Sequence, residues 1–378
     1  MTDRIDQRTL NRTTLQRQRL LSRSHEATLD LISDLLGLQA QVPGDPYVGL
    51  WSRLADFNPA SLSELMQARA VLRMVVIRGT IHLVTADDAV ALRPYAQAVL
   101  EQELRSHGGH KDHLKGVDLD QVIAYAEPFL TASPRSPTEL RALLAEEFPH
   151  LNSSALALAC RNRLPLVQTP PRGLWQSTGG LRLMTLEGWI GRDCAGISAR
   201  QSREIVLRYL AAFGPALASD IVTWSRVPSL GRTMEDMASQ LRRYTNERSQ
   251  QLFDLPDAQL INADVDSSPR FLPEYDNLLL SHKDRSRFGD DDRRRQLGQA
   301  SAIKGTVLID GFISAAWHIS RDIDTKPSKQ AAATLHVECL EKVNAATGSA
   351  VEAEGLALVR LLTPSAMHHR VKVSRIDR

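Results

Sequence analysis

Hydrophobic residues in the first hundred positions follow a helical spacing and then change to short runs rich in β-branched residues. A run of this kind stands on each side of Arg78-Gly79-Thr80, which indicates a hairpin. Thr85-Ala86-Asp87-Asp88 combines an N-cap residue with acids in a first turn, so it predicts a helix that continues to residue 104. The helical spacing covers residues 15–21, 25–36 and 62–68, and the β-prone runs cover 72–77 and 81–85.

The same order of elements recurs twice further along the chain. Three helices and a β-hairpin, repeated three times at intervals of roughly 80 to 100 residues, are the plan of tandem winged-helix modules. The alternative is an α+β enzyme whose elements fall in this order by coincidence. The second round has helices at 119–130, from 136 and at 152–163, with strands at 164–169 and 181–184; the third has helices at 202–213, 218–224 and 234–244, with strands at 251–253 and 259–261.

From Pro269 onward the chain consists of short β-prone runs. Asp310-Gly311 lies between two of them and is a strong signal for a two-residue hairpin. These runs predict a small antiparallel sheet or barrel at the C-terminus. The expected strands are 271–272, 278–280, 306–309, 312–317, 333–337 and 356–362.

Together these patterns predict an α+β fold with three tandem winged-helix modules and a C-terminal β domain. A chain of 378 residues is too long for one typical core, and its 43% hydrophobic and 24% charged content is ordinary for a soluble globular protein. The expected boundaries are 1–115, 116–196, 197–266 and 267–378.

The segment Gln39-Ala40-Gln41 is the most informative local feature. Gly37 can take the left-handed conformation that ends the preceding helix, and Pro43 prevents the helix from resuming. An extended chain places residues i and i+2 on the same side, so the two carboxamides should project together. Such a pair can hold a water molecule or polar ligand but cannot act as a general base. The alternative is that both glutamines cap the helix or pack against a wing.

Charge and cysteine content exclude several classes of protein. The net charge is only +2, so total charge does not indicate a polyanion partner, although the cations are mostly Arg, which suits phosphate contacts. No apolar stretch approaches the roughly 20 residues of a membrane span, and the start lacks a secretory signal. Cys160, Cys194 and Cys339 lack metal-ligand spacing, and their odd number fits a reducing cytoplasm. We expect no metal and no cofactor.

Several phrases match one known family in their proper order, and the match extends over nearly the whole chain. The chain resembles the winged-helix DNA glycosylases of the AlkZ/YcaQ superfamily. The matching phrases are Leu10-Asn11-Arg12, Gly37-Leu38-Gln39-Ala40-Gln41, Gly49-Leu50-Trp51, Arg78-Gly79-Thr80-Ile81-His82-Leu83-Val84, Pro170-Pro171-Arg172-Gly173-Leu174-Trp175, Arg208-Tyr209-Leu210-Ala211-Ala212-Phe213-Gly214-Pro215 and Leu272-Pro273-Glu274-Tyr275-Asp276-Asn277-Leu278-Leu279-Leu280-Ser281-His282.

This resemblance implies a C-shaped protein that curves around double-stranded DNA and excises N7-alkylated purines. In some members the substrates include bulky natural-product adducts and interstrand crosslinks. Gln39 and Gln41 match the Gln-x-Gln catalytic motif of the AlkZ-like branch, whereas the YcaQ branch has Asp at the second position. Members of the AlkZ-like branch often protect antibiotic producers from their own toxin, so the resemblance also implies a bacterial protein and a role in self-resistance.

Other residues are candidates for supporting roles. Thr80 and His82 alternate along a predicted strand, so both could face the sugar-phosphate or the water beside the glutamines. The alternative for these two is a strand-end threonine and a hydrogen-bonded core histidine. Arg172, in a short Pro-rich turn, is a further candidate for a contact with DNA. The same role is expected near the start of the C-terminal domain for Asn277, His282, Arg285 and Arg287. The alternative for this second group is that such a charged run is only a solvated face.

We therefore predict a monofunctional DNA glycosylase that acts as a cytoplasmic, nucleoid-associated monomer. No lysine adjoins the glutamine pair, which argues against Schiff-base chemistry. The competing interpretation is a winged-helix regulator or a non-catalytic sensor of DNA adducts. The predicted helix 152–163 argues against a regulator, because its only basic residues are Arg161 and Arg163, near its end.

Overall fold

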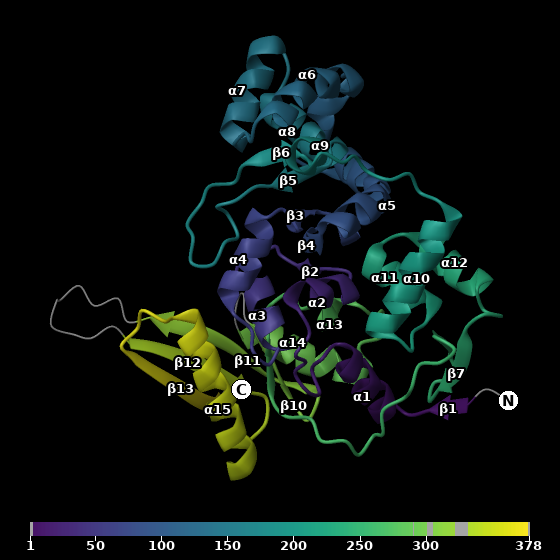
Figure 1. The fold of residues 1–378 in the computed structure, drawn as a ribbon, viewed down its shortest axis with the longest axis vertical. Helices are drawn as coiled ribbons and strands as arrows, with labels where there is room; N and C mark the ends of the chain where they lie inside the picture. The colour runs from purple at the N-terminus through teal and green to yellow at the C-terminus, as the bar shows by residue number, and fades with distance from the viewer. Residues whose placement is uncertain (1–2, 290, 301–304, 322–331, 377–378) are drawn as a thin grey trace.

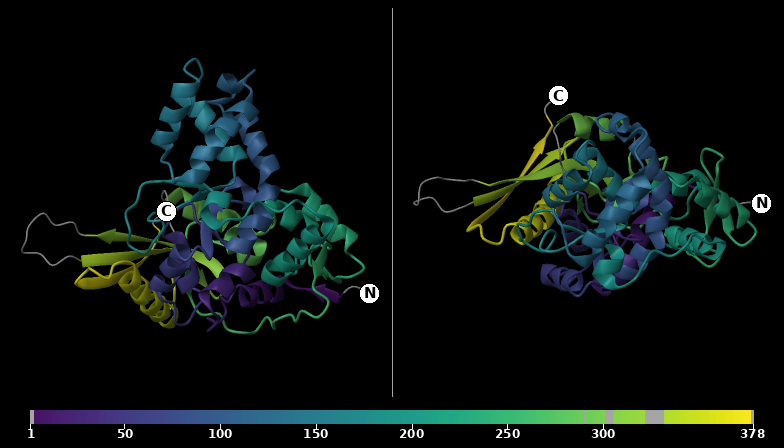
Figure 2. Two further views of the ribbon diagram at one scale, coloured as in Figure 1. Left: turned by 45° about the horizontal axis from the view of Figure 1, so that its top comes forward. Right: turned by 90° about the horizontal axis from the view of Figure 1, so that it is seen from above.

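The computed structural model describes residues 3–289, 291–300, 305–321 and 332–376. Within these ranges the chain is a mixed α/β protein with fifteen α-helices and three open sheets, none of which closes into a barrel. Figure 1 shows three groups of elements around a centre, namely α6–α8, α10–α12 and the C-terminal sheet with α15. Both views in Figure 2 show the green and yellow C-terminal strands extending to one side of the blue and teal helices.

The N-terminal region forms the predicted helices and hairpin. The hairpin expected on either side of Arg78-Gly79-Thr80 is confirmed, with the short 3-10 turn Ile77–Gly79 between its strands. The helix expected at 15–21 is wrong, because it ends at Arg17 and Arg19 has a positive φ of 56°. The elements are α1 (Gln7–Arg17), α2 (Thr28–Asp34), β2 (Leu38–Gln39), α3 (Asp45–Trp51), α4 (Pro59–Gln67), β3 (Val71–Val75), β4 (Ile81–Thr85) and α5 (Ala86–Ser106).

The second predicted round shares a sheet with the first. The central sheet has the order β2-β4-β3-β5-β6, and β3 pairs with β5 through Arg73 opposite Gln168 and Met74 opposite Val167. The first two hairpins therefore form one continuous sheet, which fixes the second round of elements relative to the Gln-Ala-Gln segment. The elements are α6 (Leu119–Ala132), α7 (Pro137–Glu147), α8 (Ser153–Arg163), β5 (Leu166–Gln168), β6 (Leu183–Thr185) and α9 (Leu186–Ile190).

The third round has the expected first two helices but a different hairpin. The helix expected at 234–244 is wrong, because the chain forms a helix at Pro228–Asp236 and then a strand that pairs with both β1 (Asp3–Ile5) and β8. On that strand Arg242 and Arg243 are both exposed and Tyr244 is buried, so the strand contributes one side chain to the core. Residues 259–261 form no strand. The elements are α10 (Ala199–Phe213), α11 (Ala218–Ser225), α12 (Pro228–Asp236), β7 (Arg242–Asn246) and β8 (Gln251–Asp254).

The C-terminal region is an open five-stranded sheet in the order β13-β12-β11-β10-β9. It is not fully antiparallel, because α15 crosses over between β12 and β13, which pair in parallel. Residues 278–280 and 356–362, expected as strands, are helical; buried Val351, Leu358 and Val359 follow the helical spacing of α15. The elements are β9 (Arg270–Leu272), α13 (Asn277–Leu280), α14 (Asp291–Ala300), β10 (Gly305–Ile309), β11 (Phe312–Arg321), β12 (Ala332–Cys339), α15 (Ala345–Leu362) and β13 (His368–Arg375).

The predicted hairpin at Asp310-Gly311 is confirmed. Ile309 pairs with Phe312, so Asp310 and Gly311 alone form the connection between β10 and β11. Both have positive φ, 50° for Asp310 and 77° for Gly311, as a two-residue turn with the right twist requires.

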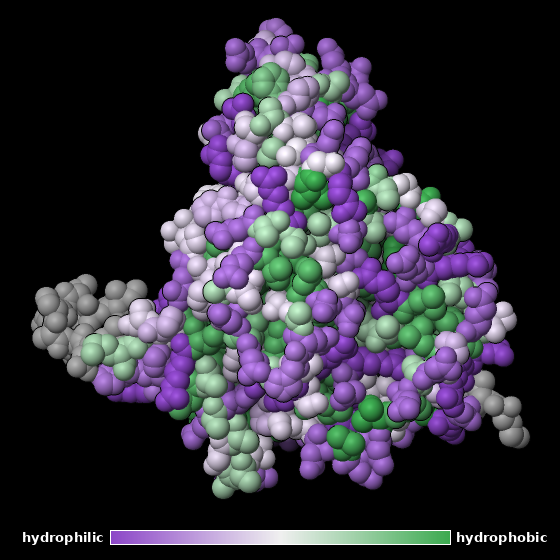
Figure 3. All heavy atoms as spheres, in the orientation of Figure 1, coloured by the Kyte–Doolittle hydropathy of each residue, from purple (hydrophilic) through white to green (hydrophobic). Residues whose placement is uncertain are grey.

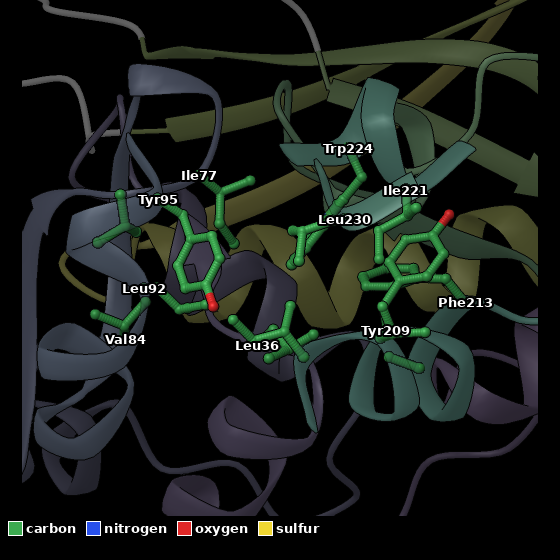
Figure 4. Packing of buried hydrophobic residues seen from close by; sticks show 14 of the residues in the cluster. Leu36, Ile77, Val84, Leu92, Tyr95, Tyr209, Phe213, Ile221, Trp224 and Leu230 are labelled. Carbon is green, nitrogen blue, oxygen red and sulfur yellow. The ribbon is translucent and has the colours of Figure 1, made fainter. Parts of the chain in front are cut away.

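One hydrophobic core joins the first and third rounds of elements. Figure 4 shows Tyr95 and Leu92 on one side of Leu36 and Leu230, with Tyr209 and Trp224 on the other. All six side chains are buried in the same cluster. Leu36 directly precedes the turn into β2, so this core also fixes where the Gln-Ala-Gln segment begins.

The outer surface mixes polar and apolar residues. Figure 3 shows hydrophilic side chains over most of one face, interrupted by small apolar patches. Among the helices of the described residues, none combines the length and the apolar character that a membrane span requires.

A fully buried ion pair ties the C-terminal region to the N-terminal one. Arg53, just after α3, donates from Nη2 and Nη1 to the two carboxylate oxygens of Asp276 at 2.8 Å each, and neither side chain is exposed. Asp276 also accepts from the amide of Leu278 at 2.9 Å and so caps α13. Arg53 donates further to Gln18 Oε1 at 3.2 Å. The carboxylate is therefore fully satisfied, and its burial depends on the arginine.

Replacing Arg53 by Met should lower the free energy of unfolding by about 3–5 kcal/mol, because Asp276 would remain buried without its cation. Urea unfolding followed by circular dichroism measures this change. The double variant Arg53→Met/Asp276→Asn should recover part of the loss. The control Arg192→Met removes the exposed pair with Asp87 and should cost no more than about 1 kcal/mol. Equal effects of both arginine substitutions would contradict this account of the buried pair.

Candidate functional site

The Gln-Ala-Gln segment begins as a strand at the edge of the central sheet. Leu36 and Gly37 have positive φ values of 56° and 92°, which reverse the chain after α2 as the sequence predicts for Gly37. A Cβ on Gly37 would lie 2.5 Å from Val84 Cγ1 and 2.8 Å from the Leu83 carbonyl oxygen, so only glycine allows this close approach to β4.

Strand β2 pairs with β4 in a fixed register. Gln39 lies opposite His82, and the amide of Ala40 donates to the carbonyl of Ile81 at 2.8 Å. The pairing therefore continues through Ala40. Figure 1 shows β2 beside β4, the strand that carries His82.

Asn277 holds the other side of β2. Its Oδ1 accepts from the Gln39 amide at 3.3 Å, and its Nδ2 donates to the carbonyl of Gly37. Asn277 is buried within the protein, so the prediction that it contacts DNA is wrong for this structure. Its role is structural: a side chain of the C-terminal region replaces the strand that β2 lacks on this edge.

The two glutamines have different environments. Gln39 is 7% exposed, and its Oε1 accepts from Arg78 Nη2 at 2.7 Å. Gln41 is exposed and begins the turn that leads through Val42 and Asp45 into α3. The strand itself ends at Gln39, so one carboxamide is held in place and the other lies at the surface next to it in sequence.

Arg78 is the group that contacts Gln39. It has a positive φ of 59° in the turn between β3 and β4, and its Nη1 donates to the carbonyl of Trp224 at 2.9 Å. Its pKa is lowered to about 10, first by burial and then by the nearby cations Arg226 and Arg285. Arg78 therefore stays charged at neutral pH and joins the first hairpin to α11 (Ala218–Ser225).

His82 is a core residue and not a contact to the surface. It is 1% exposed, its Nδ1 donates to the carbonyl of Thr80 at 2.9 Å, and Arg78 Nη2 lies 3.3 Å from its Nε2. Burial and the Arg78 charge lower its pKa to about 3, so the ring is neutral and its Nε2 accepts from Arg78. The prediction of a sugar contact for His82 is therefore wrong, and the core-histidine alternative fits. Thr80 is half-buried, and its hydroxyl donates to the Ile77 carbonyl at 3.1 Å.

A further arginine, Arg73, contacts the Gln-Ala-Gln segment at Ala40. Arg73 is 1% exposed, and its Nη2 donates to the carbonyl of Ala40 at 2.7 Å. Burial, and after it the charge of Arg172, lowers the pKa of Arg73 to about 10. Arg172 itself is half-buried on the turn after β5. The structure thus brings Arg172, from the second round, close to Arg73, the arginine that contacts the Gln-Ala-Gln segment.

Of the basic residues expected near the C-terminal domain, only Arg285 stays near the surface. His282 is fully buried, and its Nε2 donates to the Phe213 carbonyl at 3.0 Å. Arg287 is buried and donates to the Thr14 hydroxyl and the Pro215 carbonyl at 3.1 and 3.0 Å. Both are structural groups, so their predicted contact with DNA is wrong. Arg285 is half-buried and close enough to Arg78 to affect its pKa.

Sequence reasoning missed three residues around the motif, namely Arg78, Arg226 and Asp45. Arg78 could have been noticed as the polar residue in the hairpin turn, but its contact with Gln39 required the fold. Arg226 follows α11 with a positive φ of 59° and is exposed. Asp45 is buried at the start of α3, and burial, together with Glu274 and Asp276, raises its pKa to about 7.

The comparisons with known proteins agree with this architecture. The solved structure of Streptomyces sahachiroi DNA glycosylase AlkZ matches with a TM-score of 0.77 and 19% identity, over 98% of this chain and all of that one. At this identity the likeness shows the fold, which is AlkZ-like. A sequence profile described as "DNA glycosylase AlkZ-like" matches residues 32–361. The chain therefore belongs to the AlkZ-like DNA glycosylase family, and the resemblance drawn from its sequence is confirmed. No curated protein matches it.

Asp45 gives a pH-dependent prediction for stability. The folded state retains a proton on Asp45 up to about pH 7, whereas the unfolded chain releases it near the ordinary value of 3.8. The folded state thus binds more protons between these values, so this group makes stability fall as pH rises from about 4 to about 7. Asp45→Asn should remove that fall and stabilise the protein at pH 8 by about 2–4 kcal/mol.

Thermal and urea unfolding at pH 5 and pH 8 measure this difference. The matched control is Asp257→Asn, because Asp257 is an exposed aspartate in the turn that follows β8. A stability difference between Asp45→Asn and the parent that is the same at both pH values would contradict the raised pKa.

Proposed function

We propose that this protein is a monofunctional DNA glycosylase that hydrolyses the bond between deoxyribose and an N7-alkylated purine. The observation that carries the proposal is the Gln39 carboxamide, which Arg78 holds at the end of β2 next to the exposed Gln41. Membership of the AlkZ-like DNA glycosylase family supports action on DNA. From the sequence resemblance we further propose that its substrates include bulky adducts and interstrand crosslinks. The biological role that we propose is resistance of the producing organism to its own toxin.

The chemistry of the substrate suits a site without a strong acid or base. An N7-alkylguanine carries a positive charge, so it leaves without being protonated, and the transition state is oxocarbenium-like at the sugar. Carboxamide dipoles and a positioned water are then the required groups, because they stabilise developing charge and supply the nucleophile. In our proposal both glutamines act on this water: Gln41 contacts it at the surface, and Gln39 fixes the orientation of the water molecule.

The nearby titratable groups fit this scheme. His82 is neutral because its pKa is about 3, so it adds no positive charge beside the reacting sugar. Its part is to hold Arg78, which in turn holds Gln39. The side chains that contact Gln39 are those of Arg78 and Asn277, and neither is an amine that could form a Schiff base, which favours hydrolysis.

We propose that Arg172 and Arg285 bind the phosphates on either side of the damaged nucleotide. Both are half-buried; Arg172 lies close to the buried Arg73 and Arg285 lies close to the half-buried Arg78. Arginine presents a planar set of donors that suits phosphate oxygens. Thr80, also half-buried, remains a candidate for a contact to the sugar-phosphate from the same turn as Arg78.

The alternative function is a DNA-binding regulator or an adduct sensor without activity. The candidate recognition helix α8 argues against it, because Arg163 is engaged by Glu101 at 3.0 Å and Asp120 at 2.7 Å. Arg161 is then the remaining basic side chain on that helix. One arginine is poor equipment for reading base edges in a major groove.

The test is single-turnover excision from a duplex that contains one N7-methylguanine, with heat or alkali to reveal abasic sites. Gln39→Ala and Gln41→Ala should each lose about 10²–10³-fold in excision rate, because each removes one aimed dipole. Both should still bind the duplex in a gel shift. The control Gln67→Ala changes an exposed glutamine at the end of α4 and should excise at the normal rate.

Two results would decide against the proposal. Normal excision by both motif variants would remove the catalytic role of the glutamines. A native protein that shifts DNA but releases no base from any alkylated duplex would favour the regulator or sensor.

A further inference from the structure

Three arginines of the described chain are less than 2% exposed, and one of them differs from the other two in its partners. Arg12 and Arg53 each form an ion pair with an aspartate. Within the described residues Arg73 has no ion pair: its one hydrogen bond runs from Nη2 to the carbonyl of Ala40 at 2.7 Å, and its Nε and Nη1 have no partner. Arg73 is therefore a buried cation whose hydrogen-bond partner belongs to the Gln-Ala-Gln segment.

Burying a charge with so few partners lowers the stability of a protein. A buried arginine with a structural role has a different set of contacts, as Arg93 shows. Arg93 is 4% exposed and donates to the carbonyls of Asn162 and Leu164 and to Gln97 Oε1, so it closes the end of α8. Arg73 is buried to a similar degree for a single bond. Stability therefore gives little reason for a cation at position 73.

The loop after β5 fixes the position of the Arg73 side chain. Gly173 has a positive φ of 94°, and a Cβ there would lie 2.7 Å from Arg73 Cδ and 3.1 Å from its Nη1. The loop is in turn held on α3, because Tyr47 Oη donates to the Gly173 carbonyl at 2.8 Å. The guanidinium thus lies against a fixed backbone and has little freedom to turn away from the motif.

The bond from Arg73 to Ala40 determines how Gln41 is presented. The Ala40 amide donates to the backbone beside β3 and β4 at 2.8 Å, and its carbonyl accepts from Arg73, so both peptide groups of residue 40 are held. The Gln41 side chain has no hydrogen bond to another described residue, unlike Gln39, which Arg78 holds. The backbone therefore orients the Gln41 carboxamide, and Arg73 fixes the planar peptide group that directly precedes it.

We propose that Arg73 is a positioning residue for Gln41: it holds the Ala40 carbonyl inside the protein, so that the next carboxamide points at the attacking water. This inference rests on the proposed glycosylase function. Arg73 does not touch the substrate, because it is 1% exposed. It acts on Gln41 through the backbone, whereas Arg78 acts on Gln39 through the side chain. Each glutamine of the motif thus has its own arginine.

Single-turnover excision of N7-methylguanine from a duplex by the full chain tests this role. Arg73→Met leaves an apolar side chain and should slow excision by about tenfold to a hundredfold, because a small misplacement of a catalytic group has effects of this size. Its affinity for the duplex should not change. Arg73→Lys keeps a charged donor, which is all that the bond to Ala40 requires, so it should recover most of the loss.

A double-mutant cycle separates the positioning of Gln41 from a general effect on the site. In the Gln41→Ala background, Arg73→Met should slow excision by less than about twofold, because the group that Arg73 positions is already absent. The matched control is Arg93→Met, which should lower the unfolding temperature and, below it, excise at the parent rate. Arg73→Met should unfold at or above the parent temperature, because it removes a buried charge with few partners.

Hydrogen exchange provides a readout that does not depend on excision. Backbone amides in the segment 38–44 should exchange faster in Arg73→Met than in the parent, and at the parent rate in Arg93→Met. If the parent excises no N7-alkylpurine, the proposed function fails, and exchange still tests whether Arg73 fixes the segment.

Three results would overturn the positioning role. The first is a folded Arg73→Met variant that matches the parent in excision or in hydrogen exchange. The second is an Arg73→Met substitution that slows Gln41→Ala as strongly as it slows the parent. The third is an Arg73→Met variant that does not fold, because Arg73 would then be a structural residue like Arg93.

Discussion

The structure around the glutamine motif depends on the contact between the C-terminal residues Asp276 and Asn277 and the N-terminal part of the chain. Asp276 forms a fully buried ion pair with Arg53, and this fixes the start of α13. Asn277 then bonds the backbone of Gly37 and Gln39 on the edge of β2 opposite β4. A strand of two residues thus gains the partners on its second edge from a segment more than two hundred residues away, so both edges of β2 are satisfied only when the C-terminal region is in place.

Arginines are the second constraint on the site. The buried Arg73 and the half-buried Arg78 donate to Ala40 and Gln39 of the motif, and the buried Arg53 donates to Asp276, the residue before Asn277; each gives up solvation to do so. A neutral histidine and neutral carboxamides between these cations keep the site free of further positive charge. The surrounding exposed and half-buried arginines are then suited to meet an anionic polymer at the surface.

Much of the fold could be predicted from local patterns, because these patterns act over a few residues. The hairpin at residues 72–85 was predictable from β-branched runs, and the turn at Asp310-Gly311 from the need for positive φ. The strands expected at 278–280 and 356–362 were wrong because short apolar runs do not distinguish a strand from a buried helix. The helix expected at 234–244 failed for a related reason, since β7 gains its pairing from β1 at the opposite end of the sequence.

The sequence by itself determined the motif and the turn that presents it, because Gly37 and Pro43 restrict the backbone locally. It also determined the family, because the matching segments can be read directly from the residues in their order. Only the tertiary structure decided which polar residues face inward. Asn277, His282 and Arg287 look like DNA contacts in sequence but are buried among backbone carbonyls, whereas Arg78 contacts Gln39 and lies close enough to Arg226, from a separate part of the chain, for that charge to lower its pKa. Burial and charge proximity depend on how distant segments pack, and no residue spacing encodes them.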